Sequence, residues 1–388
     1  MIIKRKISKL CVITPRYPTE SNPVHTFIDQ LVCEIEDIGI DCNVISPYSI
    51  TERVVKKSTV SPRERKRITK NGNIINVYSP RYMSLSQSVF GIKTSMLTFR
   101  NFRNAVIKEY QERNLQAHSV YGHFIYPSGM CAADLGAMLG VPSFLAYGES
   151  SPASYIHVKK TMLQEKLKKL TGVISVSSEN KRELIEMGIF ENGNCIGVFP
   201  NAIDENKFFK IDREKARKEL GIENDKFVVA FVGHFIERKG VTVLSNVLNQ
   251  LDDVYSIFIG SGVEEPQCKN ILFKGTVPHE KVHVYLNAAD VFILPTSAEG
   301  CCNAIIEAMA CGLPIVSSNQ PFNDDILNIE NSIRLDVKDV VAVRQAIVFL
   351  RDNPGVRNRM SKTALISAAN LNIRQRAQNI IDFMESKI

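Results

Sequence analysis

Short apolar runs alternate with segments of helical periodicity along almost the whole chain. This alternation is typical of βαβ units, which build a parallel sheet with helices on its faces. In the first half of the chain, we predict helices near residues 26–38, 92–113, 127–139 and 178–187. The predicted strands are Leu10–Thr14, Cys42–Ser46, Ile74–Tyr78, Ser119–Tyr121, Ser143–Ala146 and Val173–Val176.

The same pattern restarts in the second half, after a polar stretch over 199–225 that holds one charged helix near 212–220. Here the strands are nearly continuous apolar runs, as expected when both faces of a sheet are buried. We predict helices near 240–251, 279–288, 303–311 and 338–351. The predicted strands are Phe227–Val232, Tyr255–Ile259, Ile271–Phe273, Asp290–Leu294 and Pro314–Ser317.

Two α/β domains follow from these two series of elements. We place the first at residues 1–200 and the second at 201–370, and we expect a last helix, 371–388, to pack back on the first domain. Each domain should be doubly wound and Rossmann-like, and the two should face each other across a cleft at the carboxyl ends of their strands, where such folds bind ligands. The basic segment 53–73 is expected to be an exposed excursion before the strand that begins at Ile74.

Composition excludes several classes of protein. The chain has 388 residues, of which 44% are hydrophobic and 23% charged, which is typical of globular domains and not of disordered chains. No apolar run approaches the roughly 18–20 residues of a membrane-spanning helix, and the run Leu10–Ile13 is shorter than the apolar core of a signal peptide. Nine cysteines without a C-x-x-C spacing are expected to be reduced. We therefore expect a cytoplasmic protein.

Charge is distributed unevenly along the chain, whose net charge is +7. Residues 1–170 contain 24 lysines and arginines against 13 acidic residues, whereas the remainder contains 24 against 28. The first half is therefore expected to meet an anionic partner, which could be a membrane, a lipid phosphate or a nucleic acid. No nucleic-acid-binding motif accompanies the charge, so we predict no nucleic acid partner.

The helix predicted near 92–113 allows two interpretations. Its apolar side chains fall on one side, with basic residues interspersed: Met96, Phe99, Phe102, Val106, Ile107 and Tyr110, with Lys93, Arg100, Arg103 and Lys108. This face could pack in the core, as in most surface helices. Together with the basic segment 53–70 it could instead dock on an anionic membrane, as a peripheral protein on the inner face of the cytoplasmic membrane. The sequence leaves both open.

Motifs for cofactors and metals are largely absent. The sequence has no G-x-G-x-x-G, no G-x-x-x-x-G-K-[ST] loop and no D-x-D, so we predict neither a dinucleotide cofactor nor a metal that carries a diphosphate. The run from His279 to His283 fits the H-E-x-x-H pattern of zinc proteases. Because Pro278 is typical of a first helical residue and no obvious third ligand follows, we favour a solvated helix start over a zinc site.

The segment 295–314 has the most informative pattern. A buried strand ends just before it, a loop follows, and a helix begins near Asn303. The backbone amides of 300–303 would then lie at the amino end of a helix, which favours an anionic group such as a diphosphate. Glu299 in the loop and Glu307 one turn inside the helix could accept hydrogen bonds from the sugar hydroxyls of one ligand. Equally, Glu299 could cap the helix and Glu307 could be a surface charge.

This segment resembles the retaining nucleotide-sugar glycosyltransferases of family four, which have the GT-B fold. The likeness rests on the spacing Glu299-x7-Glu307, with Gly300, Asn303 and the run that ends at Pro314. Four further motifs of that family match in order, at Phe199–Asp204, Val232–Gly240, Gly275–His279 and Tyr285–Pro295. The first half of the chain matches more loosely, through Thr14–Pro18 and Gly122–Pro127.

The resemblance implies that residues 201–370 bind a nucleotide-sugar donor and that residues 1–200 bind the acceptor. It implies three catalytic residues, because Glu299 would contact hydroxyls of the transferred hexose, and Arg238 and Lys239 would neutralise the departing diphosphate. Preorganised cations of this kind can take the place of a metal ion. The other implied donor contacts are Glu307 at the ribose, Val277 beside the base, Gly233 and His234 in the loop after the first strand, and Gly300, Cys301, Cys302 and Asn303 at the helix.

Three positions depart from the pattern of that family. His234 stands where an arginine is usual, and a histidine is largely neutral at pH 7. The glycine pair near the acceptor is replaced by Ser-Asn-Pro-Val-His over 21–25. Tyr147 stands where the family has a histidine that contacts the donor sugar. We take Tyr147, His123 and Arg16 as candidates on the acceptor or sugar side.

The function implied by the resemblance is transfer of a sugar from a nucleotide diphosphate-sugar to a hydroxyl group of a carbohydrate or lipid-linked acceptor, with retention of configuration. Polysaccharide or glycolipid biosynthesis is the expected setting, and we expect no cofactor and no metal. Two alternatives stay open at this point. One is a nucleotide-sugar epimerase on the same fold, and the other is a non-catalytic nucleotide-sugar binding protein, which His234 and Tyr147 suggest.

Overall fold

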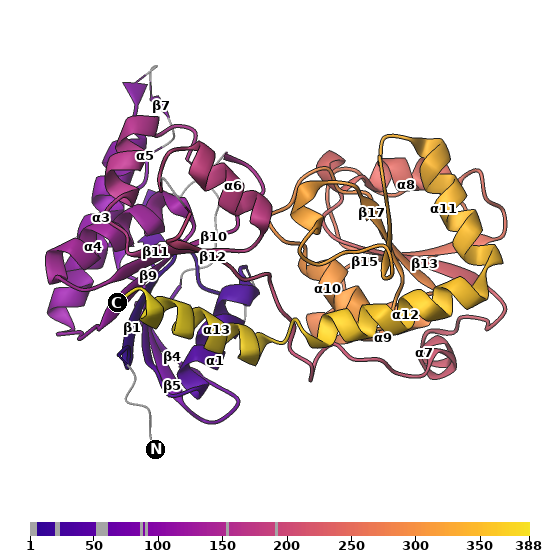
Figure 1. Ribbon diagram of the computed structural model, residues 1–388, viewed down its shortest axis with the longest axis horizontal. Helices are drawn as coiled ribbons and strands as arrows, with labels where there is room; N and C mark the ends of the chain where they lie inside the picture. The colour runs from indigo at the N-terminus through magenta and orange to yellow at the C-terminus, as the bar shows by residue number, and fades with distance from the viewer. Residues whose placement is uncertain are drawn as a thin grey trace. The chain divides into compact units, whose positions relative to one another are not determined.

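The computed structural model describes residues 6–19, 24–51, 61–85, 88–89, 92–152, 155–190 and 193–388. The chain forms two compact units, each with its own mainly or wholly parallel sheet (Figure 1). The N-terminal unit consists of the residues up to Phe199 together with Ile373–Ile388, and the C-terminal unit is Pro200–Asn372. The last helix, α13 (Ile373–Ser386), packs on α1 (Thr26–Asp37) of the N-terminal unit.

The N-terminal unit contains an eight-stranded sheet in the order β12-β11-β10-β9-β1-β2-β5-β4. The strands of this sheet are β1 (Lys9–Ile13), β2 (Asp41–Ile45), β4 (Glu64–Ile68), β5 (Ile74–Tyr78), β9 (Ser119–His123), β10 (Ser143–Tyr147), β11 (Gly172–Ser175) and β12 (Ile196–Val198). Two short pairs lie outside it, β3 (Tyr48–Ser49) with β6 (Arg81–Tyr82), and β7 (Ser88–Val89) with β8 (Ile92–Lys93). The other helices are α3 (Ser95–Glu112), α4 (Met130–Leu139), α5 (Lys160–Leu167) and α6 (Ser178–Glu186).

The C-terminal unit contains a six-stranded, wholly parallel sheet in the order β15-β14-β13-β16-β17-β18. Its strands are β13 (Phe227–Val232), β14 (Val254–Ile259), β15 (Ile271–Gly275), β16 (Val291–Leu294), β17 (Ile315–Ser318) and β18 (Ser332–Leu335). Its helices are α7 (Arg213–Leu220), α8 (Val241–Leu248), α9 (Val282–Ala288), α10 (Asn303–Ala310), α11 (Val340–Asp352) and α12 (Pro354–Ala369). Most of the apolar runs predicted as strands lie in the core of this unit, whereas Ile271–Phe273 of the edge strand β15 is only partly buried.

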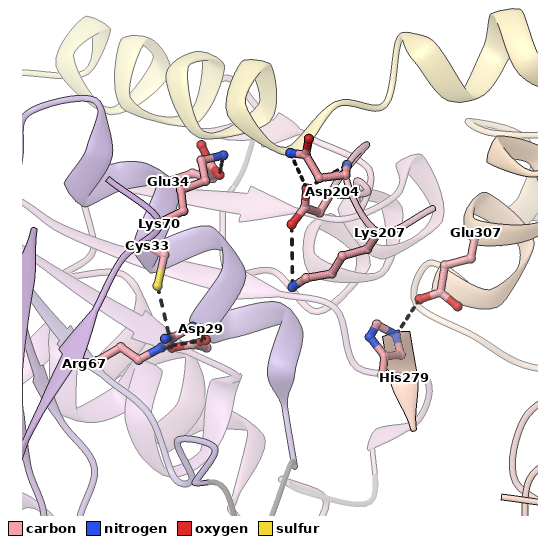
Figure 2. A network of polar contacts seen from close by, with 10 residues as sticks. Asp29, Cys33, Glu34, Arg67, Lys70, Asp204, Lys207, His279 and Glu307 are labelled. Atoms are coloured by element: carbon pink, nitrogen blue, oxygen red, sulfur yellow. Dashed lines mark hydrogen bonds and ion pairs between the residues drawn. The ribbon is translucent and has the colours of Figure 1, made fainter. Parts of the chain in front are cut away.

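The basic segment predicted as an exposed excursion is in part a strand, which corrects the prediction. Glu64–Ile68 forms β4, which pairs antiparallel with β5 at the edge of the sheet. Charged side chains on an edge strand discourage pairing with another chain. Because this strand is charged, it forms no apolar run and was not predicted as a strand. Two cations of the basic segment are neutralised, since Arg67 of the strand contacts Asp29 at 2.8 Å and Lys70 just after it contacts Glu34 (Figure 2). Residues 53–60 of the segment lie outside the described residues.

The apolar side of α3 is part of the core, so the core-packing interpretation of this helix is correct. Phe99, Phe102, Val106 and Tyr110 are buried in the N-terminal unit. These side chains are therefore not available to a bilayer in the folded unit, and membrane association of the chain stays a prediction. Among the described residues, no helix has both the length and the apolar character needed to cross a membrane.

A buried ion pair fixes the edge of the C-terminal unit where its strands begin. Asp290, just before β16, accepts hydrogen bonds from the backbone N–H of Val228 (2.8 Å) and from Arg217 of α7 (2.8 Å). Arg217 is 1% exposed and also donates to the carbonyl oxygens of Ala288 and Asn224. Each nitrogen of the guanidinium therefore has an acceptor, and the side chain ties α7 to β13 and β16.

Replacing Asp290 with alanine should be strongly destabilising, because it leaves the guanidinium of Arg217 buried and without its carboxylate. We expect a loss of about 3–5 kcal/mol in the free energy of unfolding of the C-terminal unit, measured by urea denaturation. Asp252→Ala removes a carboxylate that pairs with Lys269 at the surface, and it should leave the unfolding midpoint unchanged. Equal midpoints for the two variants would contradict the assignment of Arg217 and Asp290 as a structural anchor.

Candidate functional site

Two loops meet at the carboxyl edge of the C-terminal sheet because β13 and β16 are neighbours. Parallel strands end at the same edge, which brings together the loop after β13, residues 233–240, and the loop after β16, residues 295–302. The carbonyl oxygen of Arg238 accepts hydrogen bonds from the N–H of Ser297 (2.9 Å) and the hydroxyl of Thr296 (3.2 Å). Gly240 has φ 72°, and a Cβ there would lie 2.3 Å from the carbonyl oxygen of Pro295. Only glycine allows the loops to pack this closely.

The three residues predicted to be catalytic contact one another in these loops. Oε1 of Glu299 lies 3.1 Å from Nη1 of Arg238 and 2.6 Å from Nζ of Lys239, and it accepts a hydrogen bond of 2.8 Å from Thr296. The side chains of Glu299 and Lys239 are only 10% and 11% exposed. Burial by itself would lower the pKa of Lys239, but its neighbours, among them the paired carboxylate of Glu299, raise it above its ordinary value, so the lysine is charged at neutral pH.

The loop before α10 is held by Asn201, a residue that the sequence placed only in a linker motif. The side-chain amide of Asn201 donates to the carbonyl oxygen of Cys301 (3.2 Å) and to Oδ1 of Asn303 (2.8 Å). The N-cap residue of α10, Cys302, makes no side-chain capping hydrogen bond, so the amino end of the helix has no polar cap from this residue. Cys302 is buried, and burial raises the pKa of its thiol to about 11, which makes it a neutral, apolar side chain at the start of the helix. Gly300 beside it is also buried.

The loop after β14 supports the loop after β13 and leaves little room between them. Gly260 has φ 154°, and a Cβ there would lie 1.9 Å from the carbonyl oxygen of Gly233. The N–H of Phe235 donates to the carbonyl oxygen of Ser261 at 2.9 Å. The glycines of this stretch therefore serve close backbone packing. His234 is exposed in its loop, and Val277, after β15, is half-buried.

His279 and Glu307 form the second polar contact of this edge (Figure 2). Nε2 of His279 lies 3.2 Å from Oε1 of Glu307, and the contact raises the pKa of His279 above its ordinary value. His283 has different partners, since its Nδ1 lies 2.8 Å from the carbonyl oxygen of Glu280 and its ring packs on Phe209. No group of three His, Cys, Asp or Glu side chains that could hold a metal ion occurs in the described part of the chain.

In the N-terminal unit, the three candidates from the sequence come from neighbouring strands. Arg16 follows β1, His123 ends β9 and Tyr147 ends β10, and these strands are consecutive in the sheet. Arg16 is exposed. His123 is buried among aromatic rings, with the ring centre of Phe124 at 4.7 Å and that of Phe27 at 5.5 Å.

Burial lowers the pKa of His123 well below its ordinary value, so the imidazole is neutral at pH 7. Its Nδ1 is buried and has no hydrogen-bond partner among the described residues. In this neutral imidazole, Nδ1 can still accept or donate one hydrogen bond, depending on the tautomer. Residues 21–23, which replace part of the family's glycine motif, lie outside the described residues.

Tyr147 is a core residue, which corrects the expectation that it contacts a sugar. It is 1% exposed, and its hydroxyl donates to Glu183 of α6 at 2.9 Å and lies 3.1 Å from the hydroxyl of Tyr155. Burial raises its pKa far above the ordinary value of tyrosine. The motif comparison could not show that the side chain at this position turns into the core.

Glu149 is a polar residue of this edge to which the sequence analysis gave no role. It follows β10, and its carboxylate accepts hydrogen bonds from the N–H of Ile125 (2.7 Å) and the N–H of Gly148 (3.2 Å). The side chain is buried, and burial raises its pKa from 4.5 to about 7. The signal in the sequence was its place, directly after the tyrosine and glycine that end a predicted strand.

Comparisons with known proteins agree with this geometry. Residues 212–365, which hold both loops and α10, match the family model described as Glycosyl transferases group 1. The glycosyltransferase TuaC of Bacillus subtilis (strain 168), named for teichuronic acid biosynthesis, is 28% identical over 348 residues, which cover 87% of this chain and 88% of TuaC.

A second relative matches over a shorter part of the chain. The N,N'-diacetylbacillosaminyl-diphospho-undecaprenol alpha-1,3-N-acetylgalactosaminyltransferase of Campylobacter jejuni is 27% identical over 203 residues. The match covers 49% of this chain and about half of that enzyme, 54%.

Among solved structures, Alr3699/HepE of Anabaena in complex with UDP is similar with a TM-score of 0.74 and 16% identity, over 97% of this chain and 100% of that chain. At this identity the likeness establishes the fold. Together, the comparisons confirm two predictions made from the sequence, the GT-B fold and a glycosyltransferase of polysaccharide or glycolipid biosynthesis.

Glu149 should make the stability of the protein depend on pH. Its pKa is raised in the folded state, so the folded state is favoured below about pH 4.5, and this contribution is lost as the pH rises through about 7. At 1.36 kcal/mol per pKa unit the full loss is about 3 kcal/mol. Glu149→Gln cannot ionise, so we expect its stability relative to the wild type to increase by roughly this amount between acidic and alkaline pH.

Thermal unfolding of the wild type and Glu149→Gln at several pH values measures how their difference in stability changes with pH. The cost of replacing one carboxylate oxygen by an amide does not depend on pH, so it does not affect this change. The exposed Glu330→Gln serves as the control and should run parallel to the wild type. Parallel curves for Glu149→Gln and the wild type would contradict the burial of an ionisable carboxylate at this position.

Proposed function

We propose that the chain is a retaining hexosyltransferase whose C-terminal unit binds a nucleotide diphosphate-sugar and whose N-terminal unit binds the acceptor. The observation that supports this most directly is the contact of Glu299 with both Arg238 and Lys239 beside the uncapped amino end of α10. Two cations and a row of backbone N–H groups are what a diphosphate needs, and a carboxylate at the same place suits sugar hydroxyls.

Glu299 keeps the two cations in place before the donor binds. Because the side chain of Lys239 is almost buried, its ammonium has few water molecules to lose when a diphosphate arrives. Preorganised charges of this kind stabilise the negative charge that develops on a leaving phosphate without reorganising during the reaction. We propose that they do so without a metal ion.

The proposed reaction breaks the bond between the anomeric carbon of the sugar and the diphosphate oxygen. The acceptor hydroxyl forms a new bond to the same carbon on the same face, and its proton passes to the departing phosphate oxygen. The products are a glycoside with retained configuration and a free nucleoside diphosphate. From an alpha-configured nucleotide-sugar donor, retention would give an alpha linkage like the one in the name of the Campylobacter jejuni relative.

Two further features support the proposed substrates. Solved relatives contain UDP or UDP-glucose, which makes a uridine nucleotide the first donor to test. One relative by sequence is named for a diphospho-undecaprenol acceptor, and residues 1–170 carry an excess of basic residues. We therefore propose a glycan or lipid-linked acceptor and a cytoplasmic protein that associates peripherally with an anionic membrane.

Removing the two cations should weaken nucleotide binding. We expect Arg238→Ala and Lys239→Ala each to raise the Kd of UDP about 10- to 100-fold, which corresponds to the loss of one charge-assisted hydrogen bond of about 1.5–3 kcal/mol. Isothermal titration calorimetry on the full chain measures the change. Lys269→Ala, which removes an exposed lysine of the same unit, is the matched control and should bind as the wild type does. An unchanged Kd in the double variant Arg238→Ala/Lys239→Ala would refute the donor site.

Turnover should not require a divalent metal, because Arg238, Lys239 and the amino end of α10 carry the diphosphate. We expect the release of UDP from a UDP-sugar with a lipid-linked acceptor to continue in excess EDTA. Analysis of the products separates the alternatives, since an epimerase yields a converted sugar nucleotide and a binding protein yields no product. Loss of turnover in EDTA, with recovery on adding Mg²⁺ or Zn²⁺, would contradict the proposal.

A further inference from the structure

We propose that His279 is a positioning residue for the donor nucleotide: it holds the carboxylate of Glu307 so that one oxygen stays available to a ribose hydroxyl. This inference rests on the proposed function, in which Glu307 binds the ribose. It assigns a role to the first histidine of the H-E-x-x-H pattern, for which neither the donor site nor a zinc site accounted.

The geometry of the contact carries the proposal. Nε2 of His279 lies 3.2 Å from Oε1 of Glu307, which projects from the second turn of α10 and is 13% exposed (Figure 2). Within the described residues, the other oxygen, Oε2, accepts no hydrogen bond from a side chain. One oxygen is therefore held and the other is left for a ligand.

A glutamate has three side-chain torsions, and a carboxylate that must be frozen on binding loses rotamer freedom. The imidazole restricts that freedom before the ligand arrives, which favours binding. The imidazole is itself restricted, because the ring of Phe208 packs edge-on against it at 5.1 Å and Pro278 precedes it in the chain. Phe208 is buried, so this support is rigid.

The charges around His279 favour its protonated form. The hydrogen bond to Glu307 raises its pKa most and Glu280 of the same turn also raises it, whereas burial and the charge of Lys207 lower it, with a net rise. Lys207 is in turn paired with Asp204 at 3.6 Å (Figure 2). The imidazolium donates a charge-assisted hydrogen bond to Glu307, so the hold on the carboxylate is strongest below the raised pKa and weakens as the pH rises through it.

The test compares UDP with its 2′-deoxy and 3′-deoxy forms by calorimetry on the full chain. We expect His279→Ala to raise the Kd of UDP about tenfold, the value of one hydrogen bond to a charged group. For the deoxy form that lacks the hydroxyl bound by Glu307, the same substitution should change Kd by less than about twofold. His283→Ala removes the other histidine of the pattern, which contacts Phe209 and backbone, and should leave both affinities unchanged.

His279→Gln provides a conservative rescue. Its amide N–H can donate to Glu307 but does not titrate, so we expect it to bind UDP nearly as well as the wild type. The phosphate of UDP also titrates, but it does so equally for both proteins, so its effect cancels in the ratio of the Kd of His279→Gln to the Kd of the wild type. This ratio should change as the pH rises from about 6 to about 9, because the wild-type histidine loses its proton and the glutamine does not.

Glu307→Ala separates failure of this inference from failure of the proposed function. If Glu307→Ala binds UDP and both deoxy forms as the wild type does, or if no nucleoside diphosphate binds the wild type, the ribose assignment itself is wrong. Suppose that Glu307→Ala no longer binds UDP more tightly than the deoxy forms. If His279→Ala keeps that difference in affinity, or binds all three nucleotides more weakly by the same factor, the positioning role is refuted and the donor site stands.

Discussion

The carboxylate of Glu299 lies almost fully buried against Arg238 and Lys239, and this three-way contact is the constraint on which the candidate site depends. A buried carboxylate is costly unless cations and hydrogen-bond donors surround it. The loops after β13 and β16 must therefore stay in contact, which is possible because these two strands are neighbours in the sheet. Thr296, Gly240 and Pro295 complete the junction through hydroxyl, backbone and close packing. The same contact that stabilises the loops gathers the charges that a diphosphate requires.

The donor edge could be predicted in large part because its elements have strong local signals. The strand Phe227–Val232 was predicted with the bounds that the structure shows, since an apolar run between polar loops leaves little choice of ends. The contact of Glu299 with Arg238, about sixty positions away, could not be derived from spacing, because it depends on the strand order. The contact between His279 and Glu307 and the hold of Asn201 on the loop before α10 were missed for the same reason.

The N-terminal unit was harder to predict, because its informative residues are polar groups in unusual surroundings. The strand Glu64–Ile68 is charged at almost every position and gives no apolar run, although edge strands tolerate this. A stripe of apolar residues on α3 was compatible with both the core and a membrane surface, and only the structure shows that these side chains are buried. Tyr147 and Glu149 are adjacent to one glycine, yet the tyrosine points into the core and the glutamate binds backbone N–H groups.

The central claim is that Arg238 and Lys239 receive the diphosphate of the donor and that Glu307 receives its ribose. A crystal structure of the full chain with UDP, grown in EDTA, tests this most directly. The account predicts phosphate oxygens within hydrogen-bond distance of both cations and of the backbone N–H groups at the start of α10, with a ribose hydroxyl on the free oxygen of Glu307. A nucleotide bound elsewhere in the C-terminal unit, with Glu299 still paired to both cations, would contradict it.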